Sequence, residues 1–215
     1  TTTTTNWSFS SGGSSGAPVP TAQDPVAFDQ AGTYTVTCTG ALTCNDITVS
    51  AGTVTFAQGT SPTFAISGSM SLVAGTVWSA TGAITFNATT TGKTITTNGT
   101  SITANITFNG VGGAWSLGSA LNIGSANTVT VTNGTFNTNN YNLTAQFFNS
   151  INSNIRTVSF GSSTITLSSA LSFLTGTNLT FNAGTSTITF SVSGCILTGS
   201  GQTFYNVSGT SAFTV

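Results

Sequence analysis

Short segments in which apolar residues alternate with threonine run through most of this chain, and they constrain its fold more than any other feature. Typical examples, each with Thr between two apolar residues, are Ile84–Phe86, Ile106–Phe108, Val129–Val131 and Ile188–Phe190. Alternation with period two, rich in β-branched residues, indicates strands with one buried and one exposed face. Glycine, asparagine and serine separate the segments, as tight turns require. The sequence therefore predicts an all-β fold of many short strands.

The segments also resemble one another, which favours a repeating architecture. Four of them end in a similar turn whose glycines are Gly52, Gly99, Gly134 and Gly184. The separations of 47, 35 and 50 residues between these glycines are close to multiples of about 16 to 17 residues, a size that suits a short solenoid coil. We therefore expect a right-handed parallel β-helix, or β-solenoid, over residues 25–215. A two-sheet β-sandwich is the alternative that the same strands allow.

The composition agrees with a stack of coils. More than half of the 215 residues are Thr, Ser, Asn or Gly, and only two basic and three acidic residues occur. Like charges repeated at one position would lie about 4.8 Å apart along the stack and repel one another. Asparagine suits the turns, because it can stack on asparagine of the next coil and accepts left-handed backbone geometry.

Residues 1–24 differ from the rest of the chain. They begin with a run of Thr and continue with Ser and Gly up to Gly16, followed by Pro18 and Pro20. This composition predicts a flexible or extended N-terminal arm or linker. We expect Trp7 and Phe9 to tuck against the first coil as a cap.

Charge and hydropathy bear on the partners. Two cations cannot neutralise a row of phosphates, and the net charge is −1, so we expect neither nucleic acid nor an anionic membrane surface as a partner. No run of about 20 apolar residues is present for a membrane helix.

The inventory of reactive side chains argues against an enzyme. The chain has neither His nor Glu, so Ser-His-Asp and Cys-His arrangements cannot form within it. Its only carboxylates are Asp24, Asp29 and Asp46, and hydrogen bonds in turns or caps are favoured for them over a catalytic pair. Three cysteines without histidine argue against zinc. We expect no catalytic residue, no cofactor and no metal site.

A few other residues are worth placing individually. Cys38, Cys44 and Cys195 are interpreted as small buried side chains, and a local disulfide between the first two stays open. Lys93 is expected at a solvated turn. Arg156 is expected either to donate hydrogen bonds to carbonyl groups at a corner of a coil or to contact a neighbouring subunit.

Several aromatic residues could offer rings for stacking against sugars. The favoured interpretation places them in the core or in a subunit interface instead. They are Trp78, Trp115, Tyr141, Phe147, Phe148 and Tyr205.

Two stretches carry a resemblance to known proteins. The leader contains Asn6 to Ser8, paired and single glycines, two prolines and a Val-Ala-Phe-Asp segment that ends at Asp29. Residues 134–144 are similar to a coil of the form G-T-L-x-x-N-G-Y-x-L-T, with Asn140 where that pattern has Gly. Residues 152–157 and 160–167 add further similarity. These features resemble β-solenoid repeat proteins of phage virions and bacterial adhesins of the filamentous-haemagglutinin or autotransporter type.

The resemblance implies a structural role outside a cell. We expect a phage virion protein, such as a tail fibre, a spike or a capsid-decorating subunit, with a role in host attachment. The expected partners are other virion proteins and copies of the chain in a homotrimer, with host surface glycans as a further candidate. A bacterial cell-surface adhesin or an extracellular filament subunit is the alternative, and a binding module of a larger secreted enzyme is a third. No catalytic residues are implied.

Overall fold

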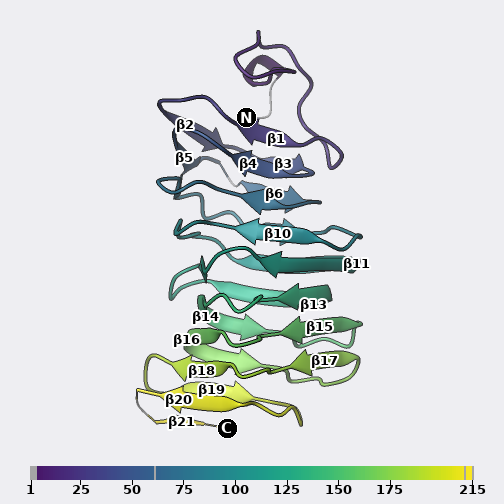
Figure 1. Ribbon diagram of the computed structural model, residues 1–215, viewed down its shortest axis with the longest axis vertical. Coiled ribbons are helices and arrows are strands. Elements are labelled where there is room, and N and C mark those ends of the chain that lie inside the picture. The colour runs from purple at the N-terminus through teal and green to yellow at the C-terminus, as the bar shows by residue number, and fades with distance from the viewer. Residues whose placement is uncertain (1–3, 61, 211, 215) are drawn as a thin grey trace.

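The chain folds into a β-solenoid of about eight turns, shown in the computed structural model of Figure 1. The structure describes residues 4–60, 62–210 and 212–214. Its strands pair with strands of neighbouring coils in parallel, as Val26 to Phe28 do with Ile47 to Val49. A β-sandwich would pair its strands antiparallel, so the solenoid expectation is confirmed. Within the described residues, no helix is long and apolar enough to span a membrane.

Three faces of stacked strands surround one interior. The first face consists of β1 (Val26–Phe28), β4 (Ile47–Val49), β7 (Met70–Ser71), β10 (Lys93–Thr96), the second halves of β11 (Ile106–Leu117) and β13 (Thr128–Asn137), β15 (Arg156–Ser159) and β17 (Leu179–Asn182). The second face consists of β3 (Ala41–Cys44), β6 (Thr63–Ile66), β9 (Ile84–Phe86), the first halves of β11 and β13, the second halves of β14 (Leu143–Asn149) and β16 (Thr164–Ser172), β19 (Cys195–Thr198) and β21 (Phe213–Thr214). The third face consists of β2 (Thr33–Cys38), β5 (Thr53–Gln58), β8 (Val77–Trp78), β12 (Leu121–Asn122), the first halves of β14 and β16, β18 (Thr187–Phe190) and β20 (Asn206–Gly209).

The coil is longer than the glycine spacing predicts. Paired residues on neighbouring coils are 18 to 26 positions apart in sequence, with Cys195 opposite Phe213 and Ala170 opposite Ile196 at the two extremes. The expected unit of 16 to 17 residues is therefore wrong. The separations between the turn glycines were misleading because these glycines do not all lie on the same face of the coil. Gly134 lies on the first face, in register with Arg156, whereas Gly99 lies beside the third face.

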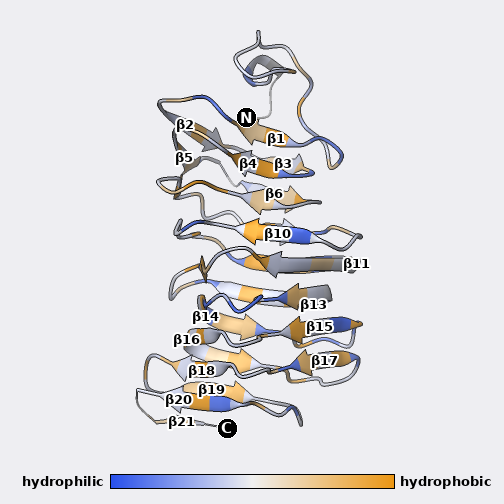
Figure 2. Ribbon diagram, in the orientation of Figure 1, coloured by the Kyte–Doolittle hydropathy of each residue, from blue (hydrophilic) through white to orange (hydrophobic). Residues whose placement is uncertain are grey.

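Hydrophobic and polar residues alternate along many of the strands (Figure 2), and most of the hydrophobic ones are buried in one core. Phenylalanine rings continue from coil to coil inside, and Phe108 has its ring centroid 5.4 Å from that of Phe86 and 4.6 Å from that of Phe136. The row continues through Phe148 to Phe160, at 6.1 and 5.2 Å. Offset and edge-on contacts of this kind stabilise a core beyond the burial of apolar area alone.

Rows of small, mostly hydroxyl or amide side chains run along the outside. One row on the second face crosses eight coils, and every member of it is half-buried. Its members are Thr43, Ala65, Thr85, Thr107, Thr130, Asn149, Ser172 and Thr198. Threonine suits this position because a branched side chain packs on the pleated surface without adding charge.

Asparagine fills the corners as expected. Asn98, Asn139 and Asn178 have positive φ, and their side-chain amides donate to carbonyl oxygens of the preceding coil, at Leu72 for Asn98 (2.7 Å). Asn133 Nδ2 donates to Asn109 Oδ1 of the coil before it, at 2.7 Å. These bonds satisfy carbonyl groups that the turns leave without a ladder partner.

The N-terminal arm folds back over the first coil. The 3₁₀ turn η1 (Thr4–Asn6) precedes Trp7, which packs against the core as the cap hypothesis expects. The carbonyl oxygen of Trp7 accepts hydrogen bonds from the amides of Gly16 and Ala17, which closes a loop between them. Phe9 does not join the cap, since 87% of it is exposed. The cap expectation is correct for Trp7 and wrong for Phe9.

Candidate functional site

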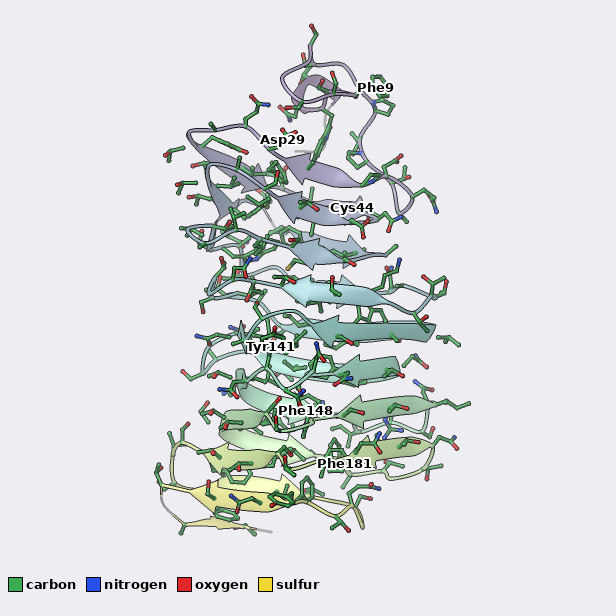
Figure 3. The ribbon with its side chains drawn as sticks, in the orientation of Figure 1. Phe9, Asp29, Cys44, Tyr141, Phe148 and Phe181 are labelled. Atoms are coloured by element: carbon green, nitrogen blue, oxygen red, sulfur yellow. The ribbon has the colours of Figure 1, made fainter. Side chains whose placement is uncertain are left out.

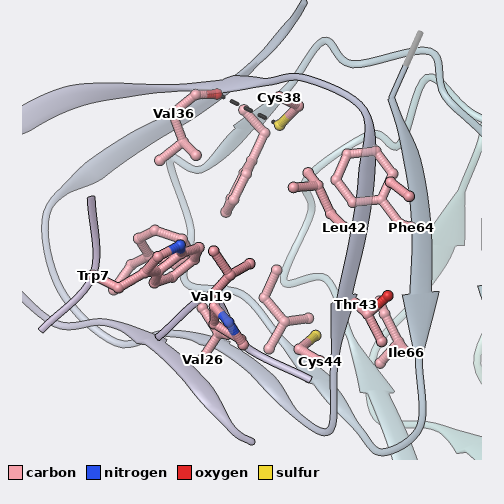
Figure 4. Close-up of a pocket in the computed structure, with 15 residues that line it drawn as sticks. Trp7, Val19, Val26, Val36, Cys38, Leu42, Thr43, Cys44, Phe64 and Ile66 are labelled. Carbon is pink, nitrogen blue, oxygen red and sulfur yellow. Dashed lines mark hydrogen bonds between the residues drawn. The ribbon is translucent and has the colours of Figure 1, made fainter. Parts of the chain in front are cut away.

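The end of the solenoid beneath the arm encloses a small apolar cavity of about 90 Å³. Trp7 and Val19 of the arm cover it, and Val36, Leu42 and Phe64 of the first coils line it (Figure 4). The arm therefore packs over the hydrophobic interior at this end, and in the part of the chain that the structure describes no further coil lies beyond β1.

Two of the three cysteines line this cavity. Cys38, Cys44 and Cys195 are buried and free, as the small-side-chain interpretation predicts, and the disulfide between the first two is not formed in the structure. Burial raises the pKa of Cys38 from its ordinary value of 9.0 to about 11. Burial, and then the charge of Asp46, raises the pKa of Cys44 to about 12. Both thiols are therefore protonated and weakly nucleophilic near neutral pH.

The stability of the fold should consequently fall as the pH rises from about 9 to about 12. The unfolded thiols ionise near 9, whereas the folded thiols keep their protons until about 11 and 12, so alkaline solution favours the unfolded chain. Urea unfolding midpoints across this range would measure the slope. A Cys38→Ala/Cys44→Ala double variant, which keeps the other titrating groups, should show a shallower decline, and equal slopes would contradict the assignment.

A larger groove, of about 760 Å³, lies between the arm and the first coil. We call it the arm groove. The arm forms one wall with Trp7 and Phe9, and residues 24–36 form the other. The side-chain amide of Gln30 bridges the walls by donating to the Ser11 hydroxyl, and it also donates to Asp29 at 3.3 Å.

All three carboxylates accept hydrogen bonds, within a turn for Asp24, from the neighbouring Gln30 for Asp29 and from the next coil for Asp46. Asp24 Oδ2 accepts from the hydroxyl and the backbone amide of Thr21, at 2.6 and 2.9 Å, and these bonds lower the pKa of Asp24. Asp46 Oδ1 accepts from the amide of Ser69 at 2.6 Å. Among the described residues, no three Cys or Asp side chains gather as metal ligands would.

Comparisons with known proteins place this geometry in no family. No family model, curated protein or solved structure matches the chain.

Arg156 occupies a buried corner and uses all of its donors. Nε donates to Ser150 Oγ at 2.6 Å, and NH2 donates to the carbonyl oxygens of Ser150 and Thr175 at 2.8 and 2.7 Å. NH1 donates to the carbonyl oxygens of Asn154 and Thr177, both at 2.9 Å. Only 1% of Arg156 is exposed, and desolvation lowers its pKa. The expectation of carbonyl contacts at a corner is confirmed.

The position of Lys93 corrects one sequence expectation, whereas the burial of Trp78, Trp115 and Phe148 confirms the favoured interpretation of them as core residues. Lys93 is not at a solvated turn: it begins β10, is half-buried, and lies in register with Trp115. Trp78 and Trp115 are core residues with exposed fractions of 2% and 0%, and Phe148 is fully buried as well. These three cannot stack against a sugar, because their positions in the alternation point their rings inward.

The remaining aromatic candidates are at least partly accessible to solvent. Tyr141 and Tyr205 are exposed, and Phe147 is half-buried.

The sequence did not predict the arm groove, because its two walls come together only when the arm folds back over the first coil. The clustering of Asp24, Asp29, Trp7 and Phe9 within the first 29 residues was the one available signal.

Proposed function

We propose that this chain is a non-enzymatic structural component of a phage particle: a tail fibre, spike or capsid-decorating subunit that lies outside the host cell and takes part in attachment. The observation that carries the proposal is the nearly uncharged surface, rich in rows of hydroxyl and amide side chains, over an aromatic core. With neighbouring coils about 4.8 Å apart, about eight turns form a rod roughly 40 Å long. A rod of this kind suits an extended external part.

The chemistry of the side chains supports a passive role. The cysteines that line the cavity are protonated, and two of the carboxylates accept hydrogen bonds within the fold. The buried cation is held by carbonyl oxygens and a hydroxyl. The resemblance of the leader and of residues 134–144 to phage and adhesin coils favours an external location.

We further propose that the chain assembles as a homotrimer. One outward row on the second face carries three successive apolar residues, Phe147, Ala170 and Ile196, between Thr128 on one side and Thr214 on the other. Half of Ile196 is exposed. Contact between copies would cover this apolar stretch, and sedimentation equilibrium of the Ile196→Asp variant against the parent chain tests the contribution of the row.

Electron microscopy of purified particles tests the virion proposal. Gold-labelled antibody against this chain should decorate particles at a fixed site, and mass spectrometry should find the chain in the same density-gradient fraction. Label on bacterial cell envelopes with none on particles would replace the virion role with the adhesin role.

A further inference from the structure

The arm groove brings carboxylates and aromatic rings together on a protein that is otherwise nearly uncharged. Two of the three carboxylates in the sequence, Asp24 and Asp29, line it together with Trp7, Phe9 and Tyr34. Outside the groove, Tyr141 and Tyr205 also expose rings, and the one further carboxylate of the sequence is Asp46. The groove's volume of about 760 Å³ falls in the range of ligand sites, roughly 300 to 1,000 Å³. This is where the chain's binding chemistry is concentrated.

The aromatic residues give the groove flat apolar surfaces. Phe9 is 87% exposed on the arm, and Figure 3 shows its ring on the arm above the first coil. Tyr34 is half-buried in β2 and packs against the core. An exposed ring on a segment anchored by Trp7 is costly to leave in water, and the apolar face of a pyranose ring could cover it.

The polar groups of the groove accept and donate hydrogen bonds. The carboxylate of Asp29 and the amide of Gln30 lie side by side, 3.3 Å apart between Nε2 and Oδ1. Desolvation, and then the Asp29 charge, raises the pKa of Tyr34, so its phenol stays a neutral donor. Carboxylate, amide and phenol groups beside aromatic rings form the set that recognises sugar hydroxyls.

The charge of the groove selects among sugars. Its lining residues include Asp24 and Asp29 but neither Lys nor Arg, so a sulfated or carboxylated ligand would meet repulsion. We infer that the arm groove binds a neutral oligosaccharide, with Phe9 stacking on a sugar ring and Asp29 accepting from its hydroxyls. This inference rests on the attachment role proposed above and names its ligand class.

Tryptophan fluorescence offers a direct test, because Trp78 and Trp115 are buried in the core and only Trp7 lines the groove. The whole chain is titrated with cellotriose, maltotriose and tri-N-acetylchitotriose. At least one should give a saturable change. Phe9→Ala should weaken its binding about tenfold, as loss of an aromatic contact does, and Asp29→Asn should weaken it severalfold.

Matched controls separate binding from folding and from the virion role. Tyr205→Ala removes an exposed ring outside the groove and should leave the affinity unchanged, while circular dichroism shows that each variant is folded. Absence of saturable binding to all three sugars would overturn the inference, as would tighter binding of a heparin oligosaccharide or of trilysine. Either failure would leave the localisation of the chain on particles intact, so the two proposals fail separately.

Discussion

Replacing Arg156 with methionine is expected to lower the free energy of unfolding by about 3 to 4 kcal/mol. The guanidinium group satisfies four carbonyl oxygens and the Ser150 hydroxyl in a corner where only 1% of the arginine is exposed. Methionine fills much of the space but donates nothing, so these acceptors would stay buried without partners. Urea unfolding, followed by circular dichroism, measures the loss.

Two further variants test whether the loss of stability comes from the hydrogen bonds of Arg156 in particular. Lys93→Met removes the other cation of the sequence from a half-buried strand position and should cost less than about 1 kcal/mol. Arg156→Lys should fall between, since an ammonium group has three donors and lacks the planar fork. Hydrogen exchange in Arg156→Met should accelerate first at residues 150–156 and 174–178. Unchanged stability in Arg156→Met would show that the corner holds without its cation.

Replacing Phe108 with alanine should lower the free energy of unfolding by about 3 to 5 kcal/mol. Its ring is fully buried and contacts Phe86, Phe136 and Trp115, with the last centroid 5.3 Å away. Neighbouring coils are fixed by their backbone ladders, so the vacated space cannot close well. Phe9→Ala is the matched control, because 87% of that residue is exposed.

The outcome for Phe108 is read from denaturant midpoints of the two alanine variants. Phe9→Ala should unfold within about 0.5 kcal/mol of the parent chain. Similar midpoints for both variants would mean that the aromatic row does not stabilise the stack. Phe108→Leu, which keeps most of the volume, should recover much of the loss.

Local patterns in the sequence predicted much of this fold. Ile-Thr-Phe alternation gave strands whose Thr faces outward, as at Thr85 and Thr107, and asparagine at the corners has the positive φ expected of it. The favoured interpretation of Trp78 and Trp115 as core residues is likewise confirmed. Coil length was mispredicted because turn glycines do not mark which face of the coil they follow.

The arm groove was beyond reach for a different reason. It depends on residues 7–20 returning across the first coil. The cap expectation placed Trp7 there, but a segment without periodicity does not indicate which residues of the coil it will face. Asp24 illustrates how far the sequence could be used. Its hydrogen bonds to Thr21 are local and could be expected, whereas the position of the arm on the other side of the groove could not be expected.

The Arg156 corner has a consequence for how such a chain can change in length during evolution. Coils of a solenoid contact mainly their neighbours, so gain or loss of one whole repeat should usually be tolerated. Around Arg156, however, Ser150 Oγ donates to the Val131 carbonyl of the coil before, and the guanidinium group donates to Thr175 and Thr177 of the coil after. These three coils form a linked triplet, and duplications or deletions are expected to spare it.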